Sequence, residues 1–188
     1  MAPRPRRFWV PGFVPKEARA AAGLALLYPR GSETALLLTV RGAHLANHRG
    51  QVSLPGGAVE DGESVEDAAL REAEEEVGLD RASVAIRLRL TPLHIPVSAY
   101  VLHPIVATAA APPVVHPCAY EVDRIVEVLL SELANGSGLA LEVREREGSA
   151  VEVPYFELGG ARLWGATAMV VAELLSVLGT TVDPWGGR

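Results

Sequence analysis

The sequence predicts an α/β fold in which a mixed β-sheet is covered by helices on its two faces. Short apolar segments bounded by turn residues dominate the chain, and two segments with a helical period lie far apart in it. The chain has 188 residues, of which 49% are hydrophobic and 21% are charged, an ordinary balance for a globular protein with a proper core. No repeat or linker divides it, so we expect one domain over residues 1–188, with an irregular Pro- and Arg-rich arm at residues 1–17.

The expected elements follow from local patterns. Turn residues separate the first two apolar runs, which predicts two strands, and a loop-like stretch then ends at Pro55-Gly56-Gly57. Gly78 ends the first helix and Gly179 the second. Glu147-Gly148-Ser149 lies between the last two strands and predicts a hairpin. In order, we expect strands Ala22–Tyr28 and Thr34–Val40, loop Leu45–Gly57, helix Ser64–Val77, strands Val84–Leu90, Tyr100–Ala107, Ile125–Leu129, Leu139–Arg146 and Val151–Leu158, and helix Ala166–Leu178.

Composition argues against two classes of partner. The net charge is −6, so nothing suggests a nucleic acid, and an acidic protein that handles phosphates needs a cation between itself and its substrate. The basic N-terminus has no apolar run long enough for a signal peptide. The uncharged segment between Arg89 and Glu121 contains six prolines, a density that membrane-spanning helices do not tolerate, so we expect no membrane partner.

Cys118 is the only cysteine, so no intrachain disulfide can form. This fits a reducing compartment, and we expect a cytoplasmic location. We also expect Cys118 to be a passive packing residue.

The first helix carries an unusual arrangement of carboxylates. At about 100° per residue, its apolar residues fall on one arc, with Glu72 and Glu76 inside the arc, Glu75 at its edge and Glu74 pointing away. A solvated acidic face is the ordinary explanation of such a run, but it accounts for Glu74 only. Unpaired charges one turn apart on an apolar side are costly, so a Mg²⁺, Mn²⁺ or Ca²⁺ ion held by hard oxygen ligands is the other explanation. Periodicity alone leaves both explanations open.

The spacing around this helix resembles the Nudix box, G-x5-E-x7-R-E-U-x-E-E-x-G-U. Gly57 is followed after five residues by Glu63, and after seven more by the segment 71–79, so that every fixed position agrees. The first U position is Ala73, which is small for a site that usually holds a bulkier apolar residue, and the second is Leu79. A signature with this many fixed positions is a specific signal.

The resemblance implies the Nudix α/β/α sandwich and a metal-dependent hydrolase that cuts a pyrophosphate bond. Glu72, Glu75 and Glu76 would hold the divalent ions, Mg²⁺ or Mn²⁺, and the backbone carbonyl of Gly56 would add a ligand. The ions would neutralise charge at phosphorus and activate a water, and a carboxylate would remove its proton. Glu72, Glu76 and Glu121 are all candidates for that base.

Other residues of the box would shape the site. By the same resemblance, Arg71 and Glu63 would orient the loop and the helix through a mutual ion pair. Gly57 and Gly62 would allow the loop to bend tightly over the helix.

The segment before the box resembles the motif of the coenzyme A pyrophosphatase branch, L-L-T-x-R-[SA]-x3-R-x3-G-x3-F-P-G-G. This resemblance implies hydrolysis of coenzyme A or its thioesters to 3′,5′-ADP and (acyl-)4′-phosphopantetheine. Arg41 and Arg49 would contact the substrate, because a positive charge there can hold phosphate. Gly57 would contact it as well. In residues 37–57 the spacing agrees throughout and eight of the eleven specified positions match; the exceptions are Gly42 for Ser/Ala, Ala46 for Arg and Leu54 for Phe.

Alternatives accompany these expectations. A structural ion pair is the other explanation of Arg41. Another nucleoside diphosphate derivative, such as ADP-ribose or a nucleotide sugar, is the alternative substrate. A non-catalytic ligand-binding module is a third reading, but such modules often lose the box carboxylates that this chain keeps. Similar proteins are often dimers, so a homodimer fits the resemblance, although nothing in the sequence fixes an interface.

Overall fold

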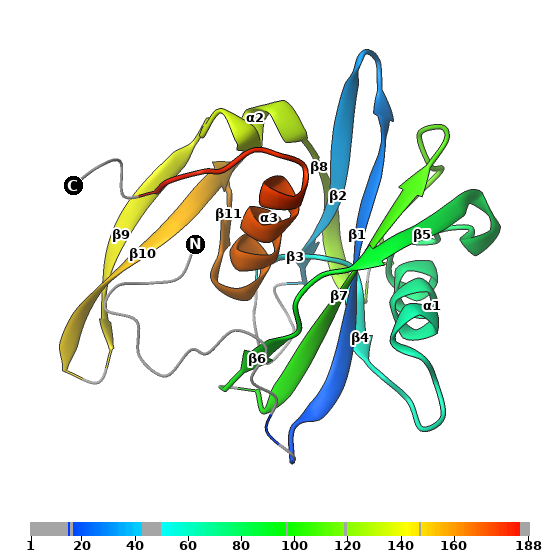
Figure 1. Cartoon of the computed structure of the whole chain (residues 1–188), viewed down its shortest axis with the longest axis horizontal. Coiled ribbons are helices and arrows are strands. Elements are labelled where there is room, and N and C mark those ends of the chain that lie inside the picture. Colours follow the sequence, from blue (N-terminus) through cyan, green and yellow to red (C-terminus); the bar gives the residue numbers. More distant parts are fainter. Residues whose placement is uncertain are drawn as a thin grey trace.

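The computed structural model of the chain describes residues 15, 17–42, 50–96, 98–118, 120–146 and 148–184, except for the side chain of residue 146. Within this part, an eight-stranded mixed sheet lies between two helices, and a three-stranded sheet lies beside the second helix (Figure 1). The expected fold of a mixed sheet flanked by helices is therefore confirmed.

The large sheet is built around β1 (Arg19–Arg30), which pairs antiparallel with β2 (Glu33–Arg41) and parallel with β7 (Tyr100–Ala109). Both faces of β1 are covered, which explains why it reads as a nearly continuous apolar run. The other strands of this sheet are β3 (Val52–Ser53), β4 (Gly56–Ala58), β5 (Val84–Arg89), β6 (Leu93–Ile95) and β8 (Val122–Leu129).

The two flanking helices pack on opposite faces of this sheet. On β1, Leu24 and Leu26 join the core under α1 (Val65–Val77), whereas Ala25 and Leu27 join the core under α3 (Gly165–Val177). This alternation is the period-two pattern of a strand. The remaining elements are the 3-10 turn η1 (Arg81–Ser83), the short helix α2 (Leu130–Ala134) and the small sheet of β9 (Leu139–Arg146), β10 (Ser149–Leu158) and β11 (Ala161–Trp164).

Helix α1 has well-formed ends. The side chain of Ser64 accepts a hydrogen bond from the backbone N–H of Asp67 at 3.1 Å, which caps the first turn. At the other end Gly78 has φ 67°, and its N–H donates to the carbonyl of Glu74 at 2.9 Å. This left-handed cap is a conformation that favours glycine, so the helix stops at the residue that the sequence indicated.

Several expectations need correction. The described part of the predicted loop Leu45–Gly57 contains β3 and β4, because these two- and three-residue strands are too short to show a period. The sequence also gave no sign of β6, α2 or β11. Cys118 is exposed and is therefore not a packing residue. Among the described residues, no helix is both long and apolar enough to cross a membrane.

Candidate active site

Two glycines of β4 allow close contacts, one with β1 and the other with α1. Gly56 pairs with Gly23 where β4 meets β1, and a Cβ atom at Gly56 would lie 2.2 Å from the carbonyl oxygen of Ala22. A Cβ atom at Gly57 would lie 2.4 Å from the carboxyl carbon of Glu72. Any larger residue at either position would therefore push the strand away from β1 or displace the helix carboxylate.

Glu76 is the most buried carboxylate of the site. It is 3% exposed and is one of only two buried polar or charged residues among those the structure describes. The backbone N–H of Gly56 donates to its Oε2 at 3.2 Å, and Nη1 of Arg41 lies 3.8 Å from its Oε1. Burial raises the pKa of Glu76 to about 7, which these two partners only partly offset. The buried charge is therefore incompletely neutralised.

Glu72 lies one turn earlier on the same side of α1. Burial is the largest cause that raises the pKa of its carboxyl group, while Arg71 lowers it. Glu74 and Glu75 differ from these two buried residues, since their side chains are 52% and 60% exposed. Glu74 pairs with Arg81 at 2.5 Å, on the side away from the sheet. The helix phase expected from the sequence is confirmed.

Arg71 joins the loop to the helix. Its Nε lies 3.0 Å from Oε1 of Glu63, and its Nη2 donates to the carbonyl of Ala58 at 3.0 Å. Its Nη1 donates to Oε1 of Glu72 at 2.9 Å and to Oε2 of Glu75 at 3.2 Å. The expected ion pair with Glu63 is present, and the same guanidinium also bridges two carboxylates of α1. Gly62, in the turn directly before Glu63, has φ 81°, a conformation that favours glycine.

Glu121 reaches the site from a different part of the chain. The N–H of Cys118 donates to the carbonyl of Glu76 at 2.8 Å, and the carbonyl of Cys118 accepts from the N–H of Glu121 at 3.0 Å. The carbonyl of Glu121 in turn accepts from the N–H of Gly42 at 2.9 Å, next to Arg41. After burial, the charge of Glu121 is among the causes that raise the pKa of both Glu72 and Glu76. The fold thus brings this carboxylate to the helix.

The remaining predicted residues are placed as follows. Arg41 forms an ion pair with Glu76, which was the alternative to a role in substrate binding. Its buried Nε has no hydrogen-bond partner among the described residues. Arg49, expected to contact substrate, lies outside the described residues, as does position 46. The sequence did not indicate that the loop of residues 112–118 contacts the helix of the site. The loop acts through backbone groups, which carry no residue-type signal.

The donor set fits a divalent cation. Glu72, Glu75 and Glu76 offer hard carboxylate oxygens from one helix, and the buried charge of Glu76 lacks a close counter-ion. In the described part of the chain, no three His, Cys, Asp or Glu side chains already converge as ligands. The reason is local: Arg71 bridges Glu72 and Glu75, and Glu76 is turned toward Gly56. A cation would therefore compete with Arg71 for these oxygens.

Comparison with known proteins points in the same direction. A family model described as the NUDIX domain matches residues 17–113. A protein of Escherichia fergusonii named uncharacterized Nudix hydrolase NudL is 37% identical over 160 residues, which cover 82% of each chain. A relative of the same name from Photorhabdus laumondii is 36% identical over 140 residues, or 74% of each chain. The crystal structure of RenU, a Nudix hydrolase from M. smegmatis, is similar with a TM-score of 0.54 and 30% identity, over 63% of this chain and 74% of that one.

Replacing Glu76 by Gln tests the cation site. Mg²⁺ should raise the melting temperature of the wild type, because the ion binds the folded state preferentially. Glu76→Gln should lose most of that shift and at least about a hundredfold in turnover, the scale of a lost major electrostatic contact.

Glu74→Gln is the matched control, since it makes the same change on the exposed side of the same helix and should keep both properties. An equal loss of the Mg²⁺ shift in the two variants would contradict this assignment of the ligands.

Proposed function

Because the chain belongs to the Nudix hydrolase family, a family of metal-dependent pyrophosphohydrolases, we propose that it cleaves the diphosphate bond of coenzyme A or its thioesters. The products would be 3′,5′-ADP and the (acyl-)4′-phosphopantetheine half. Residues 37–57, which resemble the coenzyme A branch, carry this proposal, because the described part of that segment adjoins the helix carboxylates. Arg41 ends β2 beside Glu76, and Gly56 and Gly57 lie beneath α1.

The residues of α1, together with Arg41 at the end of β2, have separate roles in the proposed reaction. Glu72, Glu75 and Glu76 would hold Mg²⁺ or Mn²⁺, which supplies Lewis acidity and neutralises charge on the diphosphate. Arg71 keeps the loop of residues 58–63 fixed against the helix, so that the ligands stay in place as substrate binds. Among the described residues, Arg41 has one ion-pair contact, with Glu76 at 3.8 Å, and in this scheme it turns toward a substrate phosphate.

Glu121 is our candidate for the proton acceptor. Glu72 and Glu76 are occupied as ligands in this scheme, whereas Glu121 comes from the turn before β8, and its charge is among the causes that raise the pKa of both. A water molecule attacks one phosphorus atom, the bridging P–O bond breaks, and the water's proton passes to the Glu121 carboxylate. Two hydrogen bonds fix the backbone of Glu121 at this position: its N–H donates to the carbonyl of Cys118, and its carbonyl accepts from the N–H of Gly42.

Another nucleoside diphosphate derivative is the second candidate substrate. The coenzyme A motif has an arginine where this chain has Ala46. That absence favours a nucleoside diphosphate with fewer phosphates to hold, such as ADP-ribose or a nucleotide sugar. The family assignment holds for either substrate.

Substrate choice is tested by comparing kcat/KM for coenzyme A, dephospho-coenzyme A, ADP-ribose, NADH and a diadenosine polyphosphate in the presence of Mg²⁺. We expect coenzyme A to be the best substrate and its 3′-phosphate to matter. Arg41→Ala should narrow the preference for coenzyme A over dephospho-coenzyme A by about 1–3 kcal/mol, the worth of a charge-assisted contact.

Arg81→Ala serves as the control, because Arg81 pairs with Glu74 on the far side of α1. Good hydrolysis of ADP-ribose, with coenzyme A barely above background, would refute the substrate assignment.

Glu121→Gln tests the proton acceptor. Turnover should fall by about 10²–10⁴-fold, the usual contribution of a general base, while the Mg²⁺ shift in melting temperature stays intact. Asp123→Asn makes the same chemical change at an exposed position two residues later and should behave as the wild type. Loss of the Mg²⁺ shift in Glu121→Gln would identify Glu121 as a ligand instead, and unchanged turnover would remove it from the mechanism.

A further inference from the structure

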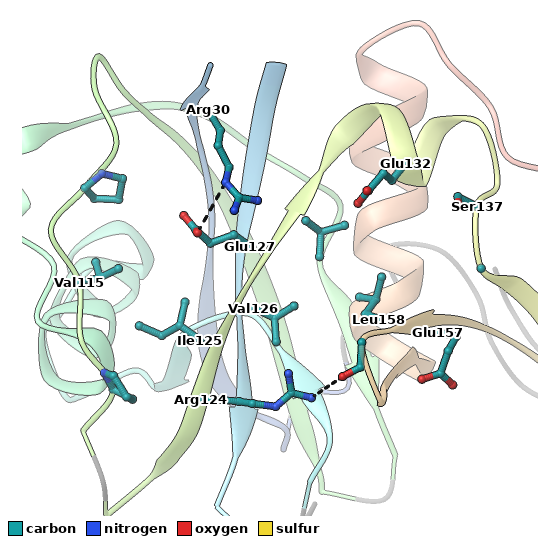
Figure 2. A pocket seen from close by; sticks show the side chains of 15 residues that line it. Arg30, Val115, Arg124, Ile125, Val126, Glu127, Glu132, Ser137, Glu157 and Leu158 are labelled. Atoms are coloured by element: carbon teal, nitrogen blue, oxygen red, sulfur yellow. Dashed lines mark hydrogen bonds and ion pairs between the residues drawn. The ribbon is translucent and has the colours of Figure 1, made fainter. Parts of the chain in front are cut away.

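A groove of about 790 Å³ runs along the outer edge of β8. Its lining includes the five consecutive residues 124–128. Side chains alternate between the two faces of a strand, so a groove that touches five in a row must follow the backbone edge. Figure 2 shows this directly, with Ile125 and Val126 pointing to opposite sides of the strand. In the described structure β8 pairs along one edge only, with β2, so its other backbone edge faces the groove.

The two walls of the groove differ, because one is apolar and the other carries polar groups. One wall comes from the loop after β7 and includes Pro113, Val115 and Pro117. His116 and Cys118, which follow Val115 and Pro117, are turned toward α1, since their N–H groups donate to its last carbonyls. Proline has no N–H to donate, so this wall is poorly suited to pair with β8 as a strand of its own. The opposite wall includes Ser137, Gly138, Leu158 and Gly159.

One end of the groove is close in the chain to residues of the candidate active site. Pro117 in its wall precedes Cys118, whose N–H holds the carbonyl of Glu76. Glu121 directly precedes β8, and Arg124, three residues on, lines the groove with its Nη2 bonded to the carbonyl of Gly159 at 3.2 Å. From Glu121 to residue 126 the strand covers five steps of about 3.3 Å, or roughly 16 Å. A ligand cut at the catalytic carboxylates can therefore extend along this edge.

The non-nucleotide half of coenzyme A has the chemistry that such a groove would bind. Its pantetheine arm is a flexible chain with two secondary amides separated by short methylene segments, and its geminal methyl groups are apolar. Its length is close to that of four or five extended residues, roughly 15 Å. The amides can pair with the free N–H and C=O groups of β8 as a peptide strand would, and the methyl groups can contact the proline wall.

We propose that the edge of β8 is the subsite for the amide-bearing pantetheine arm of the substrate. The proposal rests on the proposed function and adds to it the location of the half of the substrate that carries no nucleotide. Arg124 lies at the end nearest the diphosphate, and Arg30 with Glu127 lies at the far end of the groove (Figure 2). An added peptide strand is the competing occupant, but a peptide gains nothing from continuity with the catalytic carboxylates.

Two tryptophan substitutions fill the groove from opposite walls. Ser137→Trp changes an exposed residue, so it spares the core, and Val115→Trp fills the groove from the proline wall. Val114→Trp is the matched control, because Val114 is the adjacent residue and is 90% exposed. Each full-length variant, with Mg²⁺, is titrated calorimetrically with the two product halves, 4′-phosphopantetheine and 3′,5′-ADP, and is assayed with coenzyme A.

We expect both groove variants to raise the Kd for 4′-phosphopantetheine and the KM for coenzyme A by at least about tenfold, or 1.4 kcal/mol. The Kd for 3′,5′-ADP and the kcat should stay close to wild type, and Val114→Trp should change none of these values. If the wild type cleaves coenzyme A and Ser137→Trp binds 4′-phosphopantetheine like the wild type, the subsite proposal is wrong and a peptide becomes the better occupant. If the wild type does not cleave coenzyme A at all, the proposed substrate fails first, and the subsite fails with it.

Discussion

The burial of the Glu76 carboxylate is the constraint on which the rest of the site depends. A charged group removed from water is costly unless it is paired, and its two partners here are one N–H and an arginine 3.8 Å away. Glu72 and Glu121 add like charge nearby. The position is imposed by packing: Ala68, Ala69, Ala73 and Val77 on the same helix are fully buried against the sheet, so Glu76 is carried inward with them.

The close approach of α1 has consequences for the rest of the fold. It requires glycine at position 57, where a Cβ atom would collide with Glu72, while the pairing of β4 with β1 requires glycine at position 56. The last carbonyls of the helix, which have no partner within it, accept from the loop after β7 through His116 and Cys118. That loop ends at Glu121, and β8 starts directly after it. The placement of α1 on the sheet therefore determines the position of both the carboxylate cluster and one wall of the groove along β8.

The parts of this arrangement with a period or a fixed spacing could be predicted from the sequence. The phase of α1 followed from its apolar residues, and the burial of Glu76 with the exposure of Glu74 agrees with it. The ion pair between Arg71 and Glu63 followed from a resemblance. The elements that were missed are short, namely β3, β4, β6, α2 and β11, and segments of two to five residues give no periodic signal. The contacts of the loop at 112–118 were also unpredictable, because any residue type supplies a backbone N–H.

The central claim is that the buried carboxylates of α1 form a site for a divalent cation, and diffraction from crystals grown with Mn²⁺ tests it most directly. The account predicts an anomalous peak at coordination distance from the carboxylates of Glu72 and Glu76, with the Arg71 contact to Glu72 loosened. A peak found only beside the exposed Glu74, or Glu76 still bonded to the N–H of Gly56 with no ion near it at saturating Mn²⁺, would contradict the account.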